Sequence, residues 1–192
     1  MEKGKPYALR PEDAKRRLAD ELARLCREEG VAPVVIGGLA VNHHGYMRVT
    51  ADVDILVSRE DAVPLYRRLR SEPDWRRYAE GFKNTIVDVG LDICVEGERT
   101  APGSTEEFPD PRALRTLPVK PLPVLSLSEL IALKVMSARA RDDADVVELL
   151  KRHLSRVPKL RAAASKRLRT DKARDRLAAL VARARAEVAR RR

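Results

Sequence analysis

Short apolar runs and helical stripes alternate through the first part of the chain. Apolar residues recur at helical spacing within residues 10–30, after a Pro-Glu-Asp start and before a glycine, which predicts an N-terminal helix. The apolar runs at 31–36 and 51–57 predict two strands, and residues 39–44 between them predict a short helix. This part of the sequence therefore predicts a strand–helix–strand unit behind a first helix.

The next part is less regular. A Ser-Arg-Glu-Asp entry predicts a helix over about 58–70. We expect two β-rich pieces, near 85–87 and 91–95, to form a hairpin or a bent strand. Residues 97–111 form a loop by composition, and two prolines make 119–125 an extended segment that is at best an edge strand.

The last third of the sequence is helical throughout. Residues 127–139 follow a capping-box start, 142–154 continue with helical periodicity, and the remaining tail keeps an amphipathic pattern. The expected fold class is α+β, with a small mixed sheet flanked by helices and a helical C-terminal region. We expect a core with its N-terminal helix at 1–125 and a helical region with a basic tail at 126–192.

Charge is distributed unevenly over the chain. The net charge of the 192 residues is +10, and residues 151–192 hold 16 Lys and Arg against 3 Asp and Glu, a net of +13. Residues 1–150 therefore carry a net of −3, and a polyanionic partner, most simply RNA, would meet the tail. The alternative is that an Arg/Ala-rich helical tail is simply well solvated.

One stretch, residues 34–57, combines two features of phosphate chemistry. Gly37 and Gly38 lie where a strand turns into a helix, and backbone N–H groups at such a turn can receive a phosphate. Asp52 and Asp54 lie two apart on the following strand, so their side chains share one face. Two adjacent carboxylates are hard oxygen ligands suited to Mg²⁺ or Mn²⁺. Together these features predict phosphoryl or nucleotidyl transfer.

The glycine pair followed after thirteen residues by Asp52-Val53-Asp54 resembles the signature of the polymerase-β-like nucleotidyltransferase superfamily. Arg48 and Thr50, at alternate positions before the two aspartates, resemble the small bacterial branch that includes AbiEii-type toxins and minimal nucleotidyltransferases. Residues 126–151 are similar to the helical half of that branch. The resemblance covers about residues 31–151.

The resemblance implies a metal site made of three carboxylates. Asp52 and Asp54 would hold two divalent cations, Mg²⁺ or Mn²⁺, with Asp92 as the third metal ligand. One cation would orient the nucleoside triphosphate (NTP) and the other would activate the acceptor hydroxyl, with pyrophosphate leaving. Asp88 competes with Asp92 for the third position, and we favour Asp92 because it lies within the better strand pattern.

The resemblance also implies a set of nucleotide-binding residues. Gly37 and Gly38 would let the backbone approach the phosphates, and Thr50 would donate a hydrogen bond to them. Arg48 and Lys134 would neutralise the triphosphate charge.

Two acidic residues follow Lys134 in the next helix at positions that match the resembled pattern. Asp142 and Asp145 would either orient Lys134 or meet the acceptor. The alternative is that they are N-terminal helix acids that complement the helix dipole.

The resemblance implies a metal-dependent nucleotidyltransferase that uses an NTP and acts on RNA, with tRNA as the expected acceptor, and the basic tail fits an RNA acceptor. The resemblance implies a toxin of a toxin–antitoxin or phage-defence pair, with an antitoxin protein as partner. The enzyme alternatives are an antibiotic nucleotidyltransferase, which the basic tail disfavours, and a transferase that modifies a protein. The non-enzyme alternative is a nucleic-acid-binding or partner-binding module on a degenerate transferase fold.

The sequence lacks features of several other classes. It has no P-loop, protein-kinase, G-x-S-x-G or zinc-finger motif. It has no run of about 18 apolar residues, so we expect no membrane association. The first residues contain no apolar signal core, and we therefore expect a cytoplasmic protein.

Overall fold

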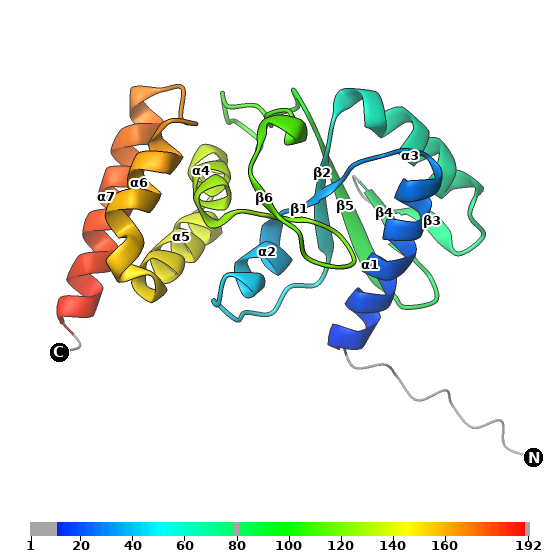
Figure 1. The fold of residues 1–192 in the computed structure, drawn as a ribbon, viewed down its shortest axis with the longest axis horizontal. Helices are drawn as coiled ribbons and strands as arrows, with labels where there is room; N and C mark the ends of the chain where they lie inside the picture. Colours follow the sequence, from blue (N-terminus) through cyan, green and yellow to red (C-terminus); the bar gives the residue numbers. More distant parts are fainter. Residues whose placement is uncertain (1–10, 79–80, 191–192) are drawn as a thin grey trace, which may run out of the picture.

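Seven strands form one mixed sheet in the computed structural model, which describes residues 11–78 and 81–190 (Figure 1). The strand order is β3-β4-β5-β2-β1-β7-β6. The strands are β1 (Val34–Val35), β2 (Val53–Val57), β3 (Trp75–Tyr78), β4 (Gly81–Asn84), β5 (Val89–Val95), β6 (Thr116–Leu117) and β7 (Val124–Leu125). Helices flank the sheet and continue beyond it, which confirms the expected α+β fold class.

The two longest strands lie side by side near the middle of the sheet. β2 and β5 pair in parallel along their length, so that Val53 faces Leu91 and Asp54 faces Asp92. In β2, Val53, Ile55 and Val57 are fully buried on one face, as expected from the alternation of the sequence. This pairing brings two carboxylates from distant parts of the sequence to neighbouring positions.

The predicted hairpin before β5 is displaced in the structure. Residues 85–87, expected to be β-rich, belong to a turn that connects β4 to β5. β4 instead covers Gly81–Asn84 and pairs with β3, which sequence patterning missed because both strands alternate poorly. A turn is needed at this point, and Asp88 adopts a left-handed conformation with φ of 56°.

The second correction concerns the segment 119–125. It contributes β7, which lies between β1 and β6 instead of at the edge of the sheet. The edge position belongs to β6, which is exposed. The prolines still limit the ladder, because the strand is confined to the two residues after Pro123.

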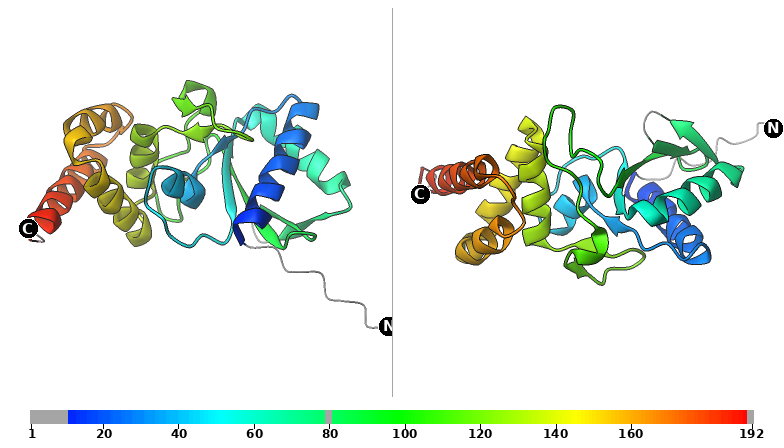
Figure 2. Two further views of the ribbon diagram at one scale, coloured as in Figure 1. Left: turned by 60° about the horizontal axis from the view of Figure 1, so that its bottom comes forward. Right: turned by 90° about the horizontal axis from the view of Figure 1, so that it is seen from above.

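Helices α1 (Pro11–Glu28) and α3 (Arg59–Ser71) lie on one side of the sheet, and α2 (Gly37–His43) lies on the other (Figure 2). The described part of α1 begins at Pro11. Residues 1–10, whose sequence contains no apolar signal core, lie outside the described residues. Ser58 caps α3 by accepting a hydrogen bond from the Asp61 amide.

The C-terminal region consists of α4 (Leu127–Ser137), α5 (Ala140–Arg152), α6 (Val157–Ser165) and α7 (Asp171–Ala189), with short 3₁₀ turns at Pro111–Ala113 and Leu154–Arg156. α4 has ten of its eleven residues buried, because α2, α5, α6 and α7 surround it. The tail forms helices, as predicted, and buries Leu177, Leu180 and Val181. Within the described ranges, no helix has the length and apolarity that crossing a membrane requires.

Candidate active site

The candidate site is built around three aspartates on two neighbouring strands. Asp54 on β2 and Asp92 on β5 are register partners, so their side chains start from adjacent points of the sheet. Asp52 lies two residues before Asp54, and its Oδ1 atom lies close to Gly90 of β5. Asp88, by contrast, lies in the turn, 83% exposed, with its Oδ1 atom 2.7 Å from the Lys83 Nζ atom.

The environment of Asp54 and Asp92 disfavours the charged form of these two carboxyl groups. Burial raises the pKa of Asp54 to about 6; the Gly38 amide opposes this shift, and the Asp92 carboxylate adds to it. Desolvation also raises the pKa of Asp92, the negative charge of Asp52 adds to it, and Arg139 acts in the opposite direction. In the described part of the chain, no Lys or Arg forms an ion pair with Asp52, Asp54 or Asp92. Neighbouring carboxylates that form no ion pair with a basic side chain are suited to share a cation.

The donor set fits a hard divalent cation. Carboxylate oxygens from Asp54 and Asp92 are the ligands that Mg²⁺ and Mn²⁺ prefer. Among residues 11–78 and 81–190, however, no three His, Cys, Asp or Glu residues converge into a compact metal-binding group. Asp54 and Asp92 therefore form the pair best placed to hold a cation, and the carboxylate of Asp52 lies next to Gly90 of β5.

Gly37 and Gly38 pack closely against the Asp54 side chain. The Gly38 amide donates a hydrogen bond to the Asp54 Oδ2 atom at 3.2 Å. A Cβ atom on Gly37 would lie 2.0 Å from that same oxygen, and one on Gly38 would lie 2.4 Å from the Thr50 hydroxyl. In this structure the two glycines leave room for the Asp54 and Thr50 side chains, and their expected approach to phosphates stays a prediction.

Gly37→Ala is expected to lower the free energy of unfolding by roughly 2 kcal/mol and to displace Asp54. Gly37 has a φ of +59°, which costs about 1–2 kcal/mol for an alanine, and the added methyl group overlaps Asp54. Urea denaturation measures the first effect, and an assay of the nucleotidyl transfer expected from the sequence measures the second. Gly30→Ala is the control, because Gly30 has a φ of +70° with no atom within 4 Å of the added Cβ. Full activity in Gly37→Ala would contradict this close fit.

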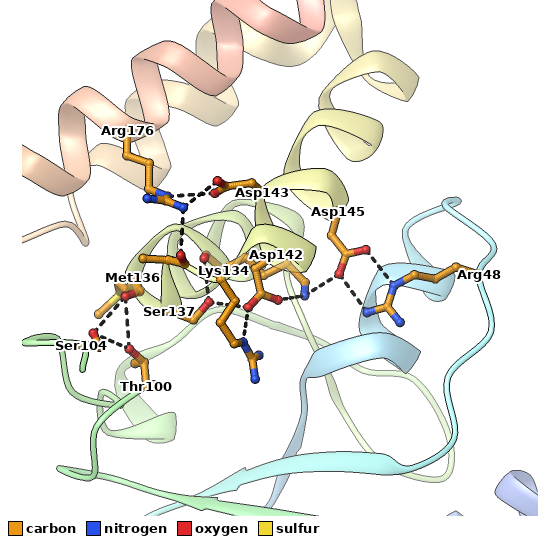
Figure 3. A network of polar contacts seen from close by, with 12 residues as sticks. Arg48, Thr100, Ser104, Lys134, Met136, Ser137, Asp142, Asp143, Asp145 and Arg176 are labelled. Carbon is orange, nitrogen blue, oxygen red and sulfur yellow. Dashed lines mark hydrogen bonds and ion pairs between the residues drawn. The ribbon is translucent and has the colours of Figure 1, made fainter. Parts of the chain in front are cut away.

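Lys134 lies at the centre of a buried ionic network (Figure 3). Its Nζ atom is 2.6 Å from the Asp142 Oδ1 atom and 2.7 Å from the Asp145 Oδ2 atom. The Ser137 hydroxyl also donates to Asp142. Burial raises the pKa of Asp142, but Lys134 and the hydrogen bonds outweigh it, so that the pKa lies below its ordinary value. Asp142 and Asp145 thus both contact Lys134 in this structure, and their role in a reaction stays a prediction.

Arg48 belongs to the same network. Its guanidinium group binds Asp145 in a bidentate manner, with Nε–Oδ1 at 2.7 Å and Nη2–Oδ2 at 2.8 Å. Its backbone amide and carbonyl both pair with the Asn42 side chain. Thr50 is buried, and its hydroxyl donates to the Asp52 carbonyl at 3.3 Å. Arg48 and Thr50 thus support the turn before β2, and their expected phosphate contacts remain predictions.

Arg139 is a residue of the candidate site that the sequence reasoning missed. It lines a cleft of about 430 Å³ together with Asp54, Asp92 and Lys134. Its Nε atom is 2.6 Å from the Asp142 Oδ2 atom, while 62% of its side chain is exposed. The i, i+3 spacing of Arg139 and Asp142 could have predicted their ion pair. It could not have predicted that Arg139 lines the same cleft as Asp54 and Asp92.

The C-terminal helices hold Arg139 in position. Ala138, which ends α4 with a φ of 56°, accepts a hydrogen bond from the Arg176 Nη2 atom of α7 at 2.9 Å. Arg176 also forms an ion pair with Asp143 at 2.6 Å. The basic tail is therefore joined to the edge of the cleft (Figure 3).

Comparison with known proteins identifies the fold. No protein-family model matches the sequence, and no curated protein matches it. A crystal structure of an antigenic nucleotidyltransferase-like protein from Paracoccidioides brasiliensis matches with a TM-score of 0.59 and 16% identity, over 90% of this chain and 89% of that chain.

Two structures of ANT(2'')-Ia match less closely. The crystal structure in complex with adenylyl-2''-tobramycin has a TM-score of 0.46 and 12% identity, over 81% of this chain and 98% of that chain. The solution structure has a TM-score of 0.48 and 14% identity, over 81% of this chain and 92% of that chain. Scores below 0.5 do not establish a shared fold, so the conclusion rests on the first match: this chain has a nucleotidyltransferase-like fold.

Proposed function

We propose that the protein is a metal-dependent nucleotidyltransferase that transfers a nucleoside monophosphate from an NTP to an RNA acceptor. The observation that carries the proposal is the cleft in which Asp54 and Asp92, without counter-ions, face Lys134 and Arg139. Carboxylates that hold a cation and basic groups that face them are what a triphosphate and its metal require.

In the proposed reaction an acceptor hydroxyl oxygen attacks the α-phosphorus of the NTP. A new P–O bond forms, the bond to the α–β bridging oxygen breaks, and pyrophosphate leaves in line with the attack. The hydroxyl proton is lost to solvent on the open side of the cleft. Arg139, more than half exposed, binds the triphosphate, and Lys134 adds positive charge from its fixed position between two aspartates.

A divalent cation held by Asp54 and Asp92, with Asp52 beside them, would supply charge neutralisation at the phosphates and at the attacking oxygen. Mg²⁺ and Mn²⁺ both suit these oxygen donors. The ordered contacts of Asp54 with Gly38 fix its orientation before any substrate arrives.

The proposal of an RNA acceptor, with tRNA as the first candidate, is supported by the charges of the tail. Several of its basic residues pair with acids, as Arg167 does with the buried Glu129. Others are exposed and form no ion pair within the described residues: Arg156, Lys159, Arg161, Lys166, Arg169, Lys172, Arg185 and Arg190. This many exposed basic groups favour binding to a phosphodiester backbone.

We further propose a toxin role. It predicts that expression of the protein arrests growth, and that variants without transfer activity do not.

Incubation of the full chain with each α-labelled NTP, Mg²⁺ and total tRNA tests the proposal. Label is expected to enter RNA with the wild type, and to fall below about one thousandth of that rate with Asp52→Ala/Asp54→Ala, because about 4 kcal/mol of metal-dependent stabilisation is lost. Omission of the metal with a chelator is expected to have the same effect.

Asp20→Ala/Asp171→Ala is the matched control, since both residues are exposed and lie outside the cleft. It removes the same number of carboxylates and is expected to keep the wild-type rate. Label that enters only a protein or only an aminoglycoside, supplied in parallel reactions, would overturn the RNA acceptor and retain the transferase. No transfer to any acceptor would overturn the enzyme.

A further inference from the structure

A second cavity, of about 760 Å³, lies outside the candidate active site, between α3 and the sheet. One face of α3 lines it with residues at helical spacing, and β3 and β5 supply the opposite wall. The residues that matter for its chemistry are Arg59, Tyr66, Arg67, Arg70, Arg77 and Glu98. We call this cavity the arginine groove; α3 and β3 pack together at this end of the molecule (Figure 1).

The charge of the groove is mostly uncompensated. Arg70 and Arg77 are exposed and form no ion pair in the part of the chain that the structure describes. Arg67 lies only 3.7 Å from the Glu29 Oε2 atom with 77% of its side chain exposed, so this pair is weak. Arg59 donates to a backbone carbonyl, that of Glu96, at 3.5 Å. Four guanidinium groups thus face one acidic lining residue, Glu98, although residues 1–150 carry a net negative charge.

The groove also offers flat surfaces. The Arg77 guanidinium carbon lies 5.8 Å from the centre of the Tyr66 ring and 5.5 Å from that of Phe82, so the guanidinium is within cation–π distance of both rings. Val63, beside Tyr66 on α3, is 69% exposed and adds apolar surface. A guanidinium held on an aromatic ring is a platform on which an unpaired base can stack. Phosphate-binding groups next to such a platform are typical of single-stranded RNA sites.

The groove and the active-site cleft meet at β5 but lie on opposite faces of the sheet. Ile93 forms part of the groove wall, whereas the side chain of the preceding Asp92 points to the other face. Ile93 and Glu98 are among the residues that line each cavity, and Glu98 lies just beyond the end of β5, so the two cavities come close to each other there. An RNA bound along the arginines therefore contacts the protein near the cleft.

We propose that the arginine groove binds a single-stranded segment of the acceptor RNA. This inference rests on the proposed function, and it assigns an acceptor contact to the core of the protein, with the tail as a second contact. Glu98 stands at the junction of the two cavities and repels the phosphates that pass it.

The test uses the full chain and a labelled single-stranded RNA dodecamer with a free 3′ hydroxyl, in anisotropy titrations over a salt series. Arg70→Gln/Arg77→Gln is expected to weaken binding about tenfold or more and to reduce the salt slope by about 1.4, since two single-strand phosphate contacts are lost. Arg16→Gln/Arg17→Gln is the control: these exposed arginines of α1 lie outside both cavities.

Glu98→Gln is the opposite test. Glutamine keeps an acceptor for the Val95 amide, which Glu98 Oε2 binds at 3.3 Å, and removes the negative charge. We expect the Kd for RNA to fall a few-fold, so this variant tests RNA binding in the groove even if the arginine variant does not fold. In the transfer assay, KM for RNA should rise for the arginine variant and fall for Glu98→Gln, with kcat changed less.

The outcomes separate the two proposals. If the wild type labels RNA, but the arginine variant and its control variant bind RNA with the same Kd and the same salt slope, the groove inference fails and the proposed transferase function stands. If the wild type neither binds nor labels RNA, the proposed function fails and the groove inference falls with it. If polyglutamate, but not RNA, competes for binding at the groove, the groove binds an acidic protein and the assignment of RNA to it is wrong.

Discussion

Asp92→Asn is expected to lower the rate of the proposed nucleotidyl transfer roughly a thousandfold, because it removes about 4 kcal/mol of stabilisation from the proposed metal-dependent step. Asp92 is the register partner of Asp54 in the parallel β2–β5 pair, and it lines the cleft with Lys134 and Arg139. The folded structure should tolerate the change, since an amide has nearly the same shape and relieves the repulsion from Asp52. Transfer rates and thermal unfolding of the same preparation measure both effects.

Asp88→Asn is the matched control for this prediction. Both aspartates were candidates for the third carboxylate, but Asp88 is 83% exposed in the turn before β5 and pairs with Lys83. Asparagine also accepts the left-handed conformation at that position. We expect a rate within about twofold of the wild type. A large loss in Asp88→Asn with little change in Asp92→Asn would assign the third carboxylate to the turn.

The sequence predicted those elements whose hydrophobic pattern is local. The alternation in β2, the capping sequence of α3 and the periodicity of α5 each determine an element without reference to the rest of the chain. β3 and β4 were missed because their sequences, WRRY and GFKN, lack a regular apolar face. They form strands only through pairing, β3 with β4 and β4 with β5. β7 became an interior strand only through its partners on both sides.

The candidate site shows the same division. The aspartates and glycines were found from their spacing, and the strand pattern of 91–95 selected Asp92 over Asp88 as a candidate. The bidentate contact of Arg48 with Asp145 joins residues 97 positions apart, which no spacing argument reveals. Arg139 and the arginine groove were missed for a related reason. Net charge averaged over residues 1–150 conceals a local cluster that folding assembles from α3 and β3.

Asp145→Ala is expected to lower the free energy of unfolding by about 3–5 kcal/mol, the cost typical of breaking one side of a buried ion pair. Asp145 is 1% exposed and binds both Arg48 and Lys134. Its removal leaves Lys134, itself 5% exposed, with Asp142 as its remaining carboxylate partner. Urea denaturation, with the m-value checked for two-state behaviour, provides the measurement.

Asp143→Ala, on the same helix, distinguishes burial from the mere loss of an ion pair. Asp143 and Arg176 keep 22% and 31% of their side chains exposed, so water replaces part of the lost interaction and the expected cost is about 1 kcal/mol. If Asp145→Ala costs no more than this control, the network contributes only as much as a surface pair. If it costs several kcal/mol more, the charges around Lys134 form a rigid unit, and Arg48, Lys134 and Arg139 keep their positions because the two buried aspartates hold them.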